Sequence, residues 1–60
     1  MDNYTAVMIA EGVEDADEDR QIEAWQHLID TGLCWQLQGS FGRMASRLID
    51  EGICSPAGAS

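Results

Sequence analysis

Three evenly spaced glycines, Gly12, Gly32 and Gly52, limit what this 60-residue chain can form. Each follows an apolar stretch with helical spacing, and each precedes another apolar residue. This pattern is typical of a Schellman motif, in which glycine takes a left-handed conformation just past a helix and the next residue folds back onto the last turn. The sequence therefore predicts three helix ends. The expected fold-back contacts are Val13 with Met8, Leu33 with Leu28, and Ile53 with Leu48.

The second and third of these helix ends are almost identical in sequence. Residues 28–34 read LIDTGLC, and residues 48–54 read LIDEGIC. The residues between the two stops do not repeat. We therefore interpret the similarity as a helix stop used twice, and not as a duplicated structural unit.

Apolar residues recur at helical spacing in three stretches. A first helix is expected over residues 4–11 with Asn3 as its N-cap, a second over 18–31, and a third over 40–51 with Ser40 as its N-cap. The apolar stripes expected on them are Tyr4, Val7 and Met8 on the first, Ile22, Trp25, Leu28 and Ile29 on the second, and Phe41, Met44, Ala45, Leu48 and Ile49 on the third.

The segment between the second and third helices, LCWQLQG, is too short to be a separate unit. Alternating Leu33, Trp35 and Leu37 would also suit a strand, but a lone strand has no partner, so we predict a helical turn or structured loop that crosses the core. The sequence thus predicts an all-α fold, a compact three-helix mini-domain over residues 1–54 with a short crossing turn. Residues 55–60 are expected to form a flexible tail. The core is expected to contain Trp25, Leu28, Trp35, Phe41, Met44 and Leu48.

The charge of the chain limits its partners. Eleven acidic residues stand against three basic ones, which gives a formal net charge of −8. Such a chain repels the phosphate backbone of nucleic acids. The excess of acid either keeps the protein soluble or attracts a basic protein partner by electrostatic steering.

The acidic run at residues 14–19, EDADED, has two interpretations. Asp15 or Asp17 is expected to cap the second helix, and Asp15 with Glu18 also fits the spacing of a capping box. Acids in a first helical turn also complement the positive end of the helix dipole. The alternative is that Asp15, Asp17, Glu18 and Asp19 form a binding face.

Few residues have the chemistry of a reactive site. His27 is the only histidine and is expected at the surface, and Cys34 and Cys54 are expected to be free, partly buried thiols. These three residues do not match a zinc-ligand spacing. No nucleophile stands at a recognisable spacing from the histidine, and no glycine-rich phosphate loop is present. We therefore expect no enzymatic activity, no metal and no cofactor.

The sequence also shows no signal for membrane insertion or secretion. It has no apolar run approaching 18 residues, and Met1 is followed by Asp2 without a basic or apolar leader. We expect an intracellular protein.

Five residues around the third helix are candidates for binding a protein: Trp35, Gln36, Gln38, Arg43 and Arg47. Aromatic and arginine side chains dominate the energetics of protein interfaces, and a minimal core does not require the polar members of this set. Arg43 and Arg47 also share one side of the third helix, as in a recognition helix that binds DNA. Against that alternative, the chain has only three basic residues, and its connection is longer than the three or four residues usual in a helix-turn-helix.

Residues 24–54, AWQHLIDTGLCWQLQGSFGRMASRLIDEGIC, resemble a widespread family of very short proteins encoded by tailed bacteriophages. Those proteins carry an HLIDTG…WQLQG…GR…LI..G.C pattern after a short acidic leader, and the match covers about half of this chain. Cys34 departs from the pattern, since alanine is expected there. The resemblance implies a phage origin and the host bacterial cytoplasm, and it supplies no catalytic residues because the family has no established biochemical function.

The leading hypothesis is therefore a small, acidic, non-enzymatic phage protein that binds a host or phage protein, with a homodimer as a further expectation. Two alternatives stay open. One is a small helix-turn-helix-like DNA-binding regulator that uses Arg43 and Arg47. The other is an inhibitor whose acidic surface mimics DNA.

Overall fold

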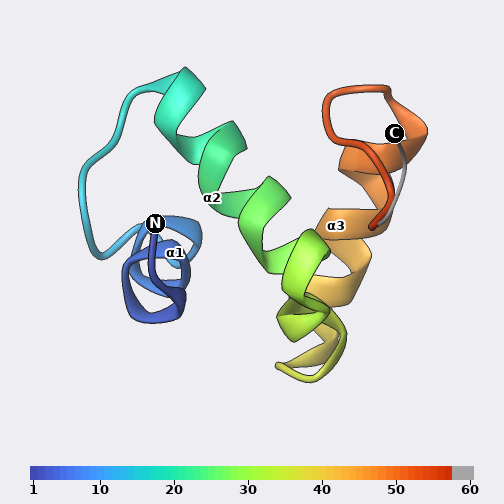
Figure 1. Cartoon of the computed structure of the whole chain (residues 1–60), viewed down its shortest axis with the longest axis horizontal. Helices are drawn as coiled ribbons and strands as arrows, with labels where there is room; N and C mark the ends of the chain where they lie inside the picture. The colour runs from blue at the N-terminus through green and yellow to red at the C-terminus, as the bar shows by residue number, and fades with distance from the viewer. Residues whose placement is uncertain (58–60) are drawn as a thin grey trace.

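The computed structural model describes residues 1–57, which form three α-helices and one short 3-10 helix and contain no strand (Figure 1). The elements in chain order are α1 (Asn3–Ala10), α2 (Glu18–Thr31), η1 (Leu33–Trp35) and α3 (Gly39–Asp50). This confirms the predicted all-α class, and η1 is the predicted crossing turn between the second and third helices. The bounds of each α-helix lie within one residue of the expected ones.

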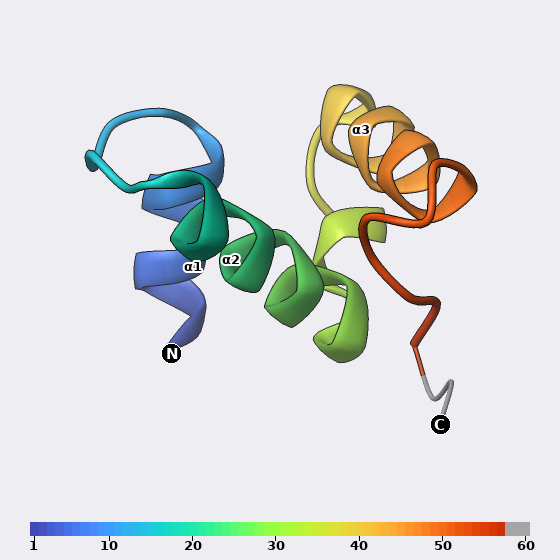
Figure 2. The same ribbon diagram turned by 90° about the horizontal axis from the view of Figure 1, so that it is seen from above.

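Helix α2 is the centre of the fold. α1 packs along one side of α2, while α3 lies on the other side and contacts η1 (Figures 1 and 2). α1 and α3 do not pack extensively against one another. The radius of gyration, 10.3 Å, is that of a compact chain of this length.

Aspartates begin the first two helices. The Asp2 carboxylate accepts a hydrogen bond from the Thr5 N–H at 3.1 Å, so Asp2 caps α1 and the prediction of Asn3 was wrong. The Asn3 side chain instead lies 2.7 Å from Nε2 of His27, which ties the start of α1 to α2. Asp17 caps α2, as one of the two predicted alternatives.

The third helix begins without a side-chain cap. The predicted cap, Ser40, lies inside the first turn, and the capping position is occupied by Gln38, whose side chain makes no capping hydrogen bond. The prediction was wrong because the helix starts one residue earlier, at Gly39.

All three glycine stops are present, with φ angles of +79°, +78° and +76° at Gly12, Gly32 and Gly52. The first and third are complete Schellman motifs: the Val13 N–H donates to the Met8 carbonyl at 3.0 Å, and the Ile53 N–H donates to the Leu48 carbonyl at 2.9 Å. The side chains that follow these two glycines nevertheless stay exposed, at 70% for the valine and 44% for the isoleucine, so the expected apolar fold-back does not bury them.

The stop at Gly32 differs because a threonine hydroxyl replaces the long backbone hydrogen bond. Thr31 Oγ1 donates its proton between two carbonyls, at 3.0 Å from His27 and 3.3 Å from Leu28, and the Leu33 N–H donates to the same hydroxyl at 3.4 Å. Glutamate precedes the other two glycines and forms no such bond. The chain therefore leaves α2 directly into η1 without folding back.

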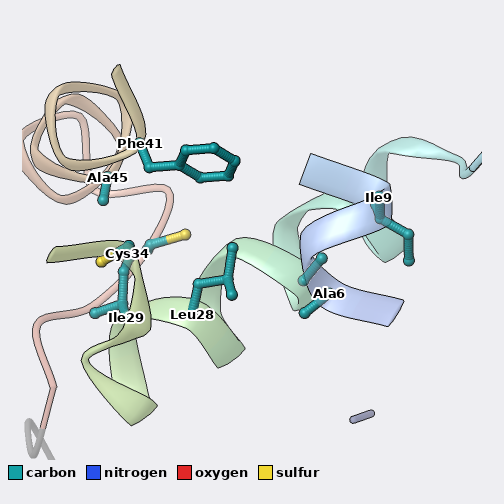
Figure 3. Packing of buried hydrophobic residues seen from close by; sticks show 9 residues of the cluster. Ala6, Ile9, Leu28, Ile29, Cys34, Phe41 and Ala45 are labelled. Carbon is teal, nitrogen blue, oxygen red and sulfur yellow. The ribbon is translucent and has the colours of Figure 1, made fainter. Parts of the chain in front are cut away.

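The core is small and rich in short side chains (Figure 3). In Figure 3, Leu28 and Ile29 of α2 lie between the residues of α1 and those of α3. On α1 the buried side chains differ from the predicted stripe, and Tyr4 is 63% exposed. The core prediction was also wrong for Trp35 and Met44, which are exposed. The buried residues are Ala6, Ile9, Ala24, Leu28, Ile29, Cys34, Phe41, Ala45 and Cys54.

After α3 the chain returns to α2. Cys54 is buried, and the Ser55 N–H donates to Oε1 of Gln26 at 2.8 Å. Nε2 of the same glutamine donates to the Ser55 carbonyl at 2.9 Å. The part of the expected flexible tail nearest α3 is thus hydrogen bonded to the central helix, and residues 58–60 lie outside the described chain.

Candidate functional site

Three of the five predicted binding residues lie together on the outer side of α3. Trp35, Arg43 and Arg47 line one open hollow with a volume of about 640 Å³. We call these three residues, with Gly42 between them, the tryptophan–arginine surface. The remaining lining residues are Gly39, Ser46, Asp50 and Glu51.

The tryptophan packs against a glycine of α3. Trp35 ends η1, and its ring lies against α3 at Gly42, where an added Cβ would be 3.5 Å from Cε3 of the indole. The ring contacts the helix there yet stays 50% exposed. Trp35 therefore packs on α3 at Gly42 while half of its side chain faces solvent.

The two arginines of this surface differ in their charge partners. Arg47 Nε lies 3.3 Å from a carboxylate oxygen of Glu51, with both side chains largely exposed. Arg43 forms no ion pair within residues 1–57. An arginine without a carboxylate partner thus lies beside an exposed indole, in a protein whose charge is strongly negative.

The other predicted candidates do not join this surface. Gln36 is exposed at the end of η1, and Gln38 lines a different groove. Of the acids, Asp17 caps α2 through the N–H of Arg20, and Glu18 and Asp19 occupy the first turn, where they complement the helix dipole. Asp15 lines a depression at the end of α1, and Asp19 lines another along α2.

A second surface was not predicted from the sequence. An open groove with a volume of about 480 Å³ lies between the end of α1 and the start of α3. Trp25 and Phe41 meet there with ring centroids 5.6 Å apart, at an interplanar angle of 42°. We call it the α1–α3 groove, and its lining residues are Ala10, Glu11, Val13, Trp25, Gln38, Ser40, Phe41 and Met44.

The sequence contained a partial signal for this groove. Val13 follows the first predicted helix and Met44 belongs to the apolar stripe of the third, and we assigned them to a fold-back contact and to the core. The core assignment of Met44 assumes that α1 and α3 close over α2, and the fold-back of Val13 would bury it against Met8. Because the two helices stay apart, these side chains line an open groove instead.

The histidine and the two cysteines lie outside these two surfaces. His27, expected at the surface, is partly buried and hydrogen bonded to the side chain of Asn3. Cys34 and Cys54 are free and buried. Burial raises the pKa of both thiols, so they are protonated at neutral pH, the less nucleophilic form. No three His, Cys, Asp or Glu residues of the described chain lie close enough together to hold a metal ion.

These features define a small all-α domain with one aromatic–arginine surface and one apolar groove. No helix in residues 1–57 has both the length and the hydropathy needed to cross a membrane. The chain belongs to the family described as "Domain of unknown function (DUF7417)", whose model matches residues 1–60. No significant match was found among curated proteins or among solved structures.

Proposed function

We propose that this chain is a small, acidic, non-enzymatic phage protein that binds a host or phage protein in the host bacterial cytoplasm. The binding site is the tryptophan–arginine surface. The observation that carries the proposal is the half-exposed Trp35 ring beside Arg43, which has no ion-pair partner in the described chain. The phage origin and the location rest on the resemblance of residues 24–54 to short tailed-phage proteins.

The exposed indole is large enough to anchor an interface. A fully buried tryptophan side chain removes up to about 250 Å² of accessible surface from water. A partner that covers the exposed half of Trp35 therefore buries on the order of 100 Å² of its surface. At about 25 cal/mol per Å², this contributes roughly 2–3 kcal/mol of binding free energy. Tryptophan and arginine are also the residue types most enriched among interface hot spots.

The excess of acid supports a partner that carries positive charge. A net charge of −8 speeds encounter with a basic protein at moderate salt, whichever surface makes the final contact. Once the partner is close, Arg43 is available to pair with a carboxylate on it. The net charge of the whole molecule affects the rate of encounter, and the tryptophan–arginine surface affects the strength of the final contact. Mutations of the acids and mutations of this surface therefore test the two contributions separately.

DNA binding through α3 has weaker support than protein binding. Arg47 is already paired with Glu51, and Asp50 lines the same hollow. Phosphates approaching Arg43 would therefore meet two carboxylates. For an acidic DNA mimic, the described acids are partly committed to capping, as in the case of Asp17.

The test is affinity capture with a tagged full-length chain from bacterial lysate, with quantification of each captured protein. We expect Trp35→Ala and Arg43→Ala each to reduce capture of the same protein at least about tenfold, as hot-spot substitutions do. Tyr4→Ala is the matched control, because Tyr4 is exposed on α1 and lines neither surface. Circular dichroism checks that all variants fold.

Two results would contradict this proposal. In the first, no captured protein depends on Trp35 and Arg43. In the second, duplex DNA is retarded in a gel at low salt and the shift is lost in Arg43→Ala, which would support the DNA-binding alternative.

A further inference from the structure

We propose that the α1–α3 groove is a second, separate binding site, and that it takes a basic amphipathic helix of a partner protein. This inference goes beyond the proposed function, because no residue lines both the groove and the tryptophan–arginine surface. α3 takes part in both sites through different faces, with Phe41 and Met44 on the groove side and Arg43 and Arg47 on the other.

The groove continues beyond the part described above. A second depression of about 410 Å³ shares Ala10, Glu11, Trp25 and Met44 with it and extends along the end of α1 to Ala16 and Gln21. The two together form one open trough with α1 and its following loop on one side and α3 on the other. Figure 2 shows these two segments on opposite sides of α2.

The trough has an aromatic floor, while polar and acidic residues line its α1 end. Trp25 and Phe41 form its aromatic floor, and both side chains are at least partly buried. Val13 and Met44 line it while 70% and 44% exposed. Exposed apolar side chains grouped around a concave site are typical of a surface that a partner covers.

The charge at this trough has one sign. Glu11 lines both of its halves, and Glu14 and Asp15 line the α1 end. No lysine, arginine or histidine lines either half. A trough with an aromatic floor and an acidic rim complements a ligand that has an apolar face and a basic flank.

A helix suits this site better than an extended peptide. A peptide that binds as a strand needs the unpaired backbone of a sheet edge, and residues 1–57 contain no strand. A helix presents apolar side chains at spacings of three, four and seven residues to a groove and keeps its basic residues at the rim.

A second copy of this chain is a poorer occupant. Each copy carries a net charge of −8, so pairing two acidic rims adds repulsion that a basic helix avoids. The charge complementarity therefore selects a basic partner over a homodimer.

The test uses the Trp35→Phe variant of the full chain, which leaves Trp25 as its single tryptophan and as a reporter inside the groove. The probe is a synthetic 18-residue peptide with leucines at helical spacing and lysines on both flanks. We expect saturable binding that shifts the Trp25 emission and increases the helicity of the peptide. Met44→Ser should weaken binding about tenfold, which corresponds to loss of one apolar contact.

Charge is tested with two matched double variants. Glu11→Gln with Glu14→Gln removes two charges at the groove, and Asp50→Asn with Glu51→Gln removes two charges on the other face of α3. Glu11 and Glu51 occupy equivalent positions, since each is the C-cap that precedes a left-handed glycine. We expect the groove variant to weaken peptide binding several-fold and to reduce its salt dependence, while the control variant stays close to the parent.

Three outcomes would overturn the inference. One is the absence of any Trp25 response at low salt, and another is an equal effect of the groove and control variants. The third is a dimer in light scattering that Met44→Ser converts to a monomer, which would make a second copy the occupant. Arg43→Ala is expected to bind the peptide as the parent does, because Arg43 does not line the groove. A negative result in this experiment therefore does not count against the proposed function of the tryptophan–arginine surface.

Discussion

The contact between Gln26 and the chain after α3 gives the most direct test of the fold. Its side-chain amide forms two hydrogen bonds with the backbone of Ser55, at 2.9 and 2.8 Å, across 29 residues of sequence. The same amide nitrogen donates to Asp30 at 3.0 Å, which holds the side chain in place. Gln26→Ala removes all of these bonds and frees the segment that follows α3.

The expected cost follows from the exposure of these bonds. A net protein hydrogen bond contributes roughly 0.5–1.5 kcal/mol, and both bonds to Ser55 lie in exposed surroundings. We therefore take the lower half of that range and expect Gln26→Ala to lower the unfolding free energy by about 1–2 kcal/mol. A 60-residue chain has roughly 3–9 kcal/mol in total, so the loss is a large fraction.

The measurement is urea unfolding followed by circular dichroism, with thermal unfolding as a second readout. Each kcal/mol lost from the unfolding free energy should lower Tm by about 4–8 °C for a chain of this size. Gln36→Ala is the control, because this exposed glutamine has no side-chain hydrogen bond in residues 1–57. Equal stability of Gln26→Ala and Gln36→Ala would refute the idea that this contact closes the fold.

Three further predictions concern stability. Gly52→Val should cost about 1–3 kcal/mol in urea unfolding because φ is +76°, whereas Gly39→Ala, at a helix start without positive φ, should cost little. Thr31→Val should cost about 0.5–1.5 kcal/mol, since it removes the hydroxyl that closes α2; an unchanged urea midpoint would contradict this. Burial raises the pKa of Cys34 and Cys54, so the unfolded chain loses these thiol protons at a lower pH than the folded chain. The contribution of the two thiols to the unfolding free energy should therefore be full below about pH 8.5 and fall above it. Replacing both cysteines with alanine should remove that part of the alkaline loss.

The glycine stops could be predicted from sequence because a left-handed residue after a helix is a local requirement. The buried face of α1 could not. Apolar residues surround this helix, from Tyr4 through Ala10, so its periodicity does not select a face. Packing against α2 selects Ala6 and Ile9, and the short side chain of Ala6 lets the two helices approach.

The tryptophan–arginine surface was partly predictable for a similar reason. Arg43 and Arg47 share a face at helical spacing, and the indole packs against Gly42. The exposure of Trp35 depends on how the chain leaves α2, and that exit depends on a hydroxyl at Thr31, where the two related stops have glutamate. The α1–α3 groove depends on two helices staying apart, and no local pattern encodes that distance.

The alanines of the core have a consequence for how this sequence can diverge. Ala6, Ala24 and Ala45, one on each α-helix, have no exposed surface. Selection at these positions acts on volume more than on polarity, because a larger side chain would have to displace a neighbouring backbone. Related sequences should therefore exchange alanine there for glycine, serine or cysteine more readily than for valine or leucine. The bulky exposed residues at the two surfaces are free of this limit, so we expect them to vary more among relatives.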